Sequence, residues 1–147
     1  MDEDPKYDSD FHAWAAEQAA LLRTGRVAEA DIQHIAEEIE TLGRGERREL
    51  VNRLSVLLLH MLKWSYQPER QGRSWELTIK EQRRALSLHL RDNPSLAAQP
   101  ESAMADAYGN AALRMAQETG LLEDMLPWSC PYTFAEAMDP DFWPGKA

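Results

Sequence analysis

Apolar residues recur at helical spacing along most of this chain of 147 residues. Residues at positions i, i+3, i+4 and i+7 share one side of an α-helix, so this spacing predicts amphipathic helices. Strand signals are nearly absent, because the chain has no alternating run of β-branched residues and no Asn-Gly or Asp-Gly hairpin turn. The sequence therefore predicts an all-α fold, a single-domain bundle of about five helices plus a short C-terminal helix.

Five long segments carry this pattern, and the residues that end them are those that usually stop helices. The segments are residues 9–24, 28–43, 45–66, 75–91 and 100–119. Gly25 and Gly120 follow two of them, and Pro68 lies just beyond a third. The segment 45–66 becomes apolar almost all round, which predicts a central helix covered by neighbours on several faces. The break at residues 43–45 is weak, so one joined helix is the alternative to two.

The two ends of the chain differ from this helical body. Residues 1–7 are predicted to be disordered or extended, and residues 8–121 to form the helical bundle. Residues 122–147 are rich in proline and tryptophan, and they are predicted to pack on the bundle as a tail. One short helix is expected there, because Thr133 and Glu136 have the spacing of a capping box. The candidate anchors of this tail are Trp128, Phe142 and Trp143.

Composition places the chain among ordinary globular domains. Its hydrophobic fraction of 44% and charged fraction of 28% exclude disordered, collagen-like and low-complexity classes. Cys130 is the only cysteine, which excludes a disulfide scaffold. The acidic first residues are unlike a secretory leader, and the longest apolar run falls well short of the ~20 residues of a membrane span. We therefore expect a cytoplasmic protein that does not associate with membranes.

Charge is distributed unevenly, with a basic middle between two acidic ends. The formal charge is −8 for residues 1–43, +6 for residues 44–91 and −7 for residues 92–147, and the total is −9. The simpler interpretation is that helices of opposite charge lie side by side in one fold. The alternative is an anion-binding face on the middle helices, but the acidic total argues against nucleic acid as the partner.

One set of candidate metal ligands lies on the predicted helix 28–43. Asp31, His34 and Glu38 share one flank of its apolar face. His34 and Glu38 have the i, i+4 spacing that places two ligands over one metal ion, and His60 is the candidate third ligand. Such a set suits a divalent transition metal such as Zn, Fe, Mn or Ni. The simpler interpretation is an exposed helix flank without a cofactor, because no complete signature such as His-Glu-x-x-His is present.

A second candidate site combines aromatic and basic side chains near the middle of the chain. Its residues are Trp64, Arg70, Arg73, Trp75 and Arg83. Aromatic rings beside arginines can stack bases or hold phosphates, which would suit an RNA- or anion-binding protein. The same residue types also make ordinary cation–π contacts inside a fold, and this is the simpler interpretation.

Motifs of nucleophilic catalysis and phosphate binding are absent from the sequence. There is no Gly-x-Ser-x-Gly elbow and no glycine-rich phosphate loop. Cys130 has no histidine near it in sequence, so a buried structural thiol is expected.

Several short motifs together resemble the bacterial Domain of Unknown Function 29 family, from about residue 7 to residue 144. They are Tyr7-Asp8-Ser9-Asp10-Phe11 with Trp14, Glu37-Glu38-Ile39-Glu40 with Leu42-Gly43, His60-Met61-Leu62-Lys63-Trp64 with Gln67-Pro68, Ser74-Trp75 with Thr78-Ile79, Arg83, and Asn93-Pro94-Ser95-Leu96. The resemblance implies an all-helical bundle and a bacterial cytoplasmic setting, and it implies no activity.

These observations favour a non-enzymatic helical module that binds a protein partner or associates with itself. The reasons are the lack of a convincing catalytic set and the separation of charge along the chain. The first alternative is a metal-dependent hydrolase that uses His34, Glu38 and His60. The second alternative is an RNA- or anion-binding accessory protein.

Overall fold

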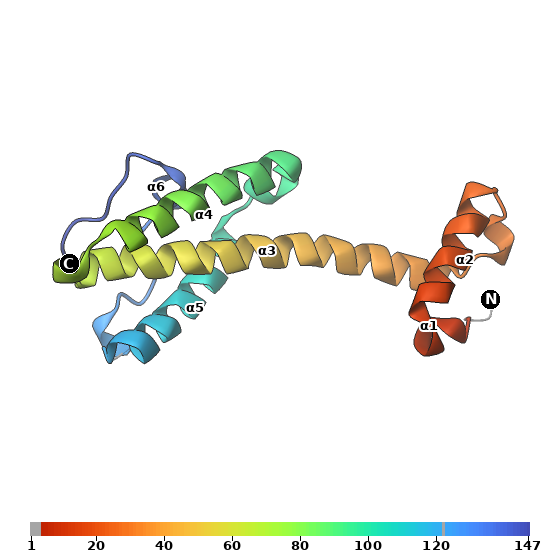
Figure 1. The fold of residues 1–147 in the computed structure, drawn as a ribbon, viewed down its shortest axis with the longest axis horizontal. Coiled ribbons are helices and arrows are strands. Elements are labelled where there is room, and N and C mark those ends of the chain that lie inside the picture. Colours follow the sequence, from red (N-terminus) through yellow and green to blue (C-terminus); the bar gives the residue numbers. More distant parts are fainter. Residues whose placement is uncertain (1–3, 122) are drawn as a thin grey trace. The chain divides into compact units, whose positions relative to one another are not determined.

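The computed structural model describes residues 4–121 and 123–147, which form α-helices joined by short 3₁₀ turns and contain no strand (Figure 1). The helices are α1 (Lys6–Ser9), α2 (Phe11–Arg23), α3 (Ile32–Tyr66), α4 (Arg73–Asp92), α5 (Glu101–Thr119) and α6 (Phe134–Met138). The predicted all-α class is therefore confirmed. No helix within these described ranges combines the length and the apolar character that crossing a bilayer requires.

Helix α3 is 35 residues long and joins the two helices that were predicted separately on either side of residues 43–45. The prediction of a break was wrong because Gly43 and Gly45, unlike proline, keep the backbone N–H that continues the helical hydrogen-bond ladder. An ion pair at i, i+4 spacing between Glu40 and Arg44, 3.8 Å apart, spans the first of these glycines.

The start of the chain is more helical than its sequence suggested. Residues 6 and 7, which were expected to be extended, belong to α1. Helix α2 begins at Phe11, two residues later than predicted, because the side chain of Asp10 caps it by accepting a hydrogen bond from the Ala13 N–H at 3.1 Å. Residues 1–3 lie outside the described part of the chain.

The chain divides into two compact units, Met1–Gly45 and Glu46–Ala147, called here the N-terminal and C-terminal units. Helix α3 contributes residues to both. The hydrophobic core lies in the C-terminal unit, where the apolar side chains of α3 are fully buried, as predicted for a central helix. These side chains are Leu54, Leu57, Leu58, Met61 and Leu62.

Within the C-terminal unit, hydrogen bonds join α4 and α5 to the central helix. His89 of α4 bonds to the backbone carbonyl of Glu46 at 2.8 Å, and Arg47 reaches Asp106 of α5 at 3.0 Å. The opposite charges of the basic middle and the acidic C-terminal segment thus meet at this last pair, as the charge pattern suggested.

The described part of the tail, residues 123–147, packs against this core. Phe142 and Trp143 lie on the core, as expected of anchors, whereas Trp128 is fully exposed. The predicted capping box is present, because Thr133 and Glu136 satisfy each other's backbone N–H groups. Leu122 lies outside the described residues.

Candidate functional site

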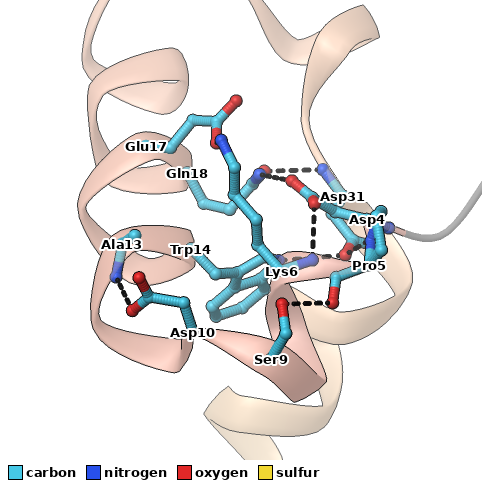
Figure 2. A network of polar contacts seen from close by, with 10 residues as sticks. All are labelled: Asp4, Pro5, Lys6, Ser9, Asp10, Ala13, Trp14, Glu17, Gln18 and Asp31. Atoms are coloured by element: carbon cyan, nitrogen blue, oxygen red, sulfur yellow. Dashed lines mark hydrogen bonds and ion pairs between the residues drawn. The ribbon is translucent and has the colours of Figure 1, made fainter.

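A buried carboxylate, Asp31, is the centre of a polar network in the N-terminal unit (Figure 2). Its side chain accepts hydrogen bonds from the indole N–H of Trp14 at 3.0 Å and the backbone N–H of Asp4 at 3.3 Å. It also lies 2.7 Å from Nδ1 of His34, and its own backbone N–H donates to the side chain of Gln18. The network therefore ties α2 and the residue Asp4 before α1 to the first turn of α3.

The charge state of Asp31 follows from a balance of two effects. Burial raises the pKa of its carboxyl, but the hydrogen bonds from His34 and Trp14 outweigh burial and hold the pKa below its usual range. Asp31 is 5% exposed and carries a full negative charge at neutral pH. Its donors make that buried charge tolerable, so the carboxylate is committed to structure.

Beside this network, Tyr7 and Glu38 form a hydrogen-bonded pair. The hydroxyl of Tyr7 donates to the carboxylate of Glu38, and this bond, together with burial, raises the pKa of Tyr7 to about 12. The aromatic ring of Tyr7 lies against the imidazole of His34. The predicted metal ligands of this unit thus contact aromatic residues and one another.

The structure brings together only part of the predicted metal set. Asp31 and His34 are in direct contact, whereas Glu38 binds Tyr7. His60 belongs to the C-terminal unit and lies 26 residues after His34 on α3. Its Nδ1 lies 2.8 Å from the backbone carbonyl of Val56. Burial lowers the pKa of His60. These contacts do not support one metal site built from Asp31, His34, Glu38 and His60.

Arg83, a predicted anion-binding residue, is buried beneath the tail. Its guanidinium donates to the backbone carbonyls of Ala137 and Phe142, each at 2.8 Å, and lies over the ring of Trp143 at 5.6 Å. One guanidinium nitrogen, Nη1, has no hydrogen-bond partner among the described residues. Arg83 therefore holds the tail against α4 and is not available to an external anion.

The remaining members of that predicted set divide into aromatic residues with internal contacts and exposed arginines. Trp64 packs on Trp143 of the tail, with ring centroids 4.7 Å apart. Trp75 lies 5.8 Å below the ammonium of Lys63. Arg70 and Arg73 are exposed. The aromatic residues thus make the internal contacts that were the simpler interpretation of the pattern.

The N-terminal half of α3 carries an apolar stripe made of Ile32, Ile35, Ile39 and Leu42, in which Ile35 is half-buried and the other three are exposed. These residues have the 3-4-3 spacing of one helix face. Ile39 is 63% exposed and Leu42 is 72% exposed. The periodicity predicted such a face, but a helix packed in a bundle would have buried it.

Apolar exposure is common throughout the N-terminal unit. Among residues 4–45, the buried apolar side chains are Trp14 and Ala30. The large apolar side chains that remain exposed there are Phe11, Leu22, Val27, Ile32, Ile39 and Leu42. This unit is therefore held together mainly by its polar and aromatic contacts, and it leaves much apolar surface in contact with water.

The helix that carries the apolar stripe is acidic. Glu38 lies on one flank of the stripe, Glu37 and Glu40 project from the other side of the helix, and residues 32–43 contain no lysine or arginine. Residues 1–43 as a whole carry a formal charge of −8. The stripe is thus a narrow apolar surface in an acidic environment.

In the C-terminal unit, the structure brings together two carboxylates and a histidine that the sequence patterns did not indicate. Glu46 and Glu49 lie one turn apart on α3, and His89 faces them from α4. One ligand atom of each lies within 4.8 Å of the others, beside an open hollow of about 570 Å³. No local motif indicates this cluster, because His89 lies about 40 residues after the two glutamates in sequence.

Comparisons with known proteins give a family and no named relative. The family model of DUF29, a domain of unknown function, matches residues 6–143, which is nearly the whole chain. No curated protein and no solved structure matches the chain.

Proposed function

The chain belongs to the DUF29 family, and we propose that it is a non-enzymatic helical module that binds another protein through the apolar stripe of α3. The setting that the motif resemblance implies for this binding is the bacterial cytoplasm.

The observation that carries the proposal is the exposure of Ile39 and Leu42, at 63% and 72%, on a regular helix face. Contiguous apolar surface on a folded protein marks an interaction site more often than single exposed residues do. Covering this surface removes it from water and contributes roughly 25 cal/mol for each Å² of apolar area. The helix is already formed, so binding need not order it.

The partner that fits this surface is an amphipathic helix with basic flanks. A 3-4-3 stripe packs against a similar stripe on a second helix, as positions a and d do in a coiled coil. Glu38 borders the stripe, and residues 1–43 carry a formal charge of −8, so the field around this surface attracts a partner that carries lysine or arginine. A second copy of this chain would instead bring two segments of formal charge −8 together, so a different, basic partner is favoured.

Binding to designed helical peptides tests the proposal. We expect the full chain to bind a fluorescent peptide with leucine at positions a and d and lysine at positions e and g. A peptide with the same leucines but glutamate at e and g should bind at least tenfold more weakly. Replacing both Ile39 and Leu42 by glutamine should weaken binding of the basic peptide at least tenfold, because it removes the apolar contact without changing the charge.

The control variant is Leu113→Gln, which changes another exposed leucine, 55% exposed, on α5. It should leave peptide binding unchanged. Equal binding by the wild-type chain and the Ile39→Gln, Leu42→Gln variant would overturn the proposed surface. Sedimentation equilibrium tests whether a second copy of the chain binds the stripe instead. A wild-type chain that is dimeric and a double variant that is monomeric would show that it does.

A further inference from the structure

The cluster of Glu46, Glu49 and His89 combines two conditions of a metal site, a converging ligand set and a buried histidine aimed into it. The two glutamates have i, i+3 spacing, so they project from the same side of α3. His89 is only 8% exposed, and its Nδ1 lies 3.4 Å from the carboxylate of Glu49. The nearer carboxylate oxygen of Glu46 lies 3.7 Å from Nε2, the other nitrogen of the ring, so Glu49 is the carboxylate that faces Nδ1 and Glu46 completes the set from the adjacent turn.

The hydrogen bond of His89 determines where its ring carries a proton. Nε2 lies 2.8 Å from the backbone carbonyl oxygen of Glu46, and a carbonyl only accepts, so Nε2 carries the hydrogen. In the neutral ring, Nδ1 then presents a lone pair, and this lone pair faces the carboxylate of Glu49. The lone pair of Nδ1 and the carboxylate oxygen of Glu49 repel each other at this distance. A cation between them, either a proton on Nδ1 or a metal ion, removes this repulsion.

The distance fits a metal ion. Nitrogen and oxygen ligands each lie about 2.0–2.1 Å from a tetrahedral zinc ion, which places them about 3.3–3.4 Å from each other. The separation of 3.4 Å between Nδ1 of His89 and the carboxylate of Glu49 agrees with this value.

The groups behind the three ligands orient them as the outer groups of metal sites usually do. His89 donates its other ring N–H to a backbone carbonyl. The second carboxylate oxygen of Glu49 accepts from Nε of Arg53 at 3.1 Å, which leaves the first oxygen for a ligand. The side chain of Asn93 lies 3.5 Å from the carboxylate of Glu46. The two carboxylates thus have partners outside the cluster, and His89 is held by the backbone of Glu46.

We infer that Glu46, Glu49 and His89 bind one divalent transition-metal ion between α3 and α4. One imidazole nitrogen and two carboxylates are a donor set that suits Zn²⁺, Mn²⁺, Fe²⁺, Co²⁺ or Ni²⁺. Arg53 and Asp92 line the same hollow and their opposite charges cancel, so the two glutamates supply the negative charge that attracts the ion. The ion would link two helices of the C-terminal unit, and the site is separate from the apolar stripe proposed to bind protein.

Titration of the full chain with zinc and cobalt, after treatment with a chelator, tests the site. We expect calorimetry to show one ion per chain, and cobalt to develop the visible absorption of a low-symmetry site. Glu49→Gln keeps the shape of the ligand and should weaken zinc binding at least tenfold. His89→Gln should do the same, with circular dichroism showing whether the fold is retained.

Two exposed residues supply matched controls. Glu69→Gln and His12→Gln make the same chemical changes outside the cluster, and they should leave the affinity and the stoichiometry unchanged. No binding at millimolar zinc, or binding that Glu49→Gln leaves unchanged, would overturn the proposal. Nitrogen NMR of the imidazole provides an independent readout, because a zinc-dependent shift of Nδ1 supports the site. A ring protonated at both nitrogens and unaffected by zinc would assign the cluster to an ordinary ion pair.

Discussion

His34 stacks face to face on Tyr7, with ring centroids 3.8 Å apart and ring planes inclined by 8°. The same histidine contacts Asp31, and the same tyrosine donates to Glu38, so one stacked pair connects α1 to two positions on α3. Because the N-terminal unit buries so few apolar side chains, such contacts supply much of its cohesion. Its stability should therefore depend on the charge of its central carboxylate.

The first prediction is that acid destabilises the N-terminal unit through Asp31. The folded pKa of this carboxyl is below its unfolded value of about 3.9. Its contribution to stability is therefore complete above that value and is lost as the pH falls through the folded pKa. The indole N–H resonance of Trp14, which bonds to Asp31, should report this loss at acid pH.

Two asparagine variants separate this effect from general acid unfolding. Asp31→Asn removes the charge, so it should destabilise the unit at neutral pH and abolish the acid-dependent step seen at Trp14. Asp8→Asn removes an exposed charge from α1 of the same unit and should leave that step in place. An acid-dependent step that persists in Asp31→Asn would assign the titration to another group.

The second prediction concerns the clamp that Arg83 forms on the tail. Arg83→Lys keeps the charge but cannot reach the carbonyls of Ala137 and Phe142 together. Since a hydrogen bond to a charged group contributes about 1.5–3 kcal/mol, we expect a loss of about 2–4 kcal/mol in the free energy of unfolding. Urea denaturation measures this loss, and hydrogen exchange should show faster exchange in residues 134–143.

The neighbouring residue offers the control for that substitution. Arg84 is exposed, so Arg84→Lys should change the unfolding free energy by less than about 0.5 kcal/mol. If Arg83→Lys were equally mild, the carbonyl contacts of the buried guanidinium would not hold the tail.

Local patterns predicted most of the helices because they depend on residues near one another in sequence. The stops at Gly25 and Gly120 and the capping box at Thr133 lie where the rules for helix ends place them. The break near Gly43 failed for a local reason too, since glycine weakens a helix without removing a hydrogen bond. The apolar residues on all sides of segment 45–66 also correctly predicted that this part of α3 lies in the core.

Contacts between distant segments were beyond the sequence patterns. Arg83 was a candidate anion-binding residue in the sequence. Its actual partners are backbone carbonyls more than 50 residues away, which no side-chain motif reveals. His89 was overlooked because its carboxylate neighbours lie about 40 residues earlier. Periodicity likewise showed the face that contains Leu42 but not whether another element covers that face. Burial, unlike helix formation, is decided by the rest of the chain.

The third prediction contrasts two leucines on α3. Leu58 is 0% exposed, so Leu58→Ala should cost about 2–5 kcal/mol of unfolding free energy through lost burial and the cavity left behind. Leu42 is 72% exposed, so Leu42→Ala should change that free energy by no more than about 0.5 kcal/mol. Urea denaturation of the isolated chain measures both. A large loss in Leu42→Ala would mean that the stripe is buried within the chain itself.

The last prediction is that alanine has opposite effects at two glycines of α5. Gly120 ends the helix with a φ of 74°, a left-handed conformation that costs an L-residue about 1–2 kcal/mol. Gly109 lies inside the helix, and a Cβ there would meet no atom within 4 Å beyond its chain neighbours and the helix backbone. Gly120→Ala should therefore lower the melting temperature, whereas Gly109→Ala should raise it, because alanine favours the helix interior by about 0.8–1.0 kcal/mol. Calorimetry of the two variants checks both signs, and a stabilised Gly120→Ala would contradict the left-handed helix end.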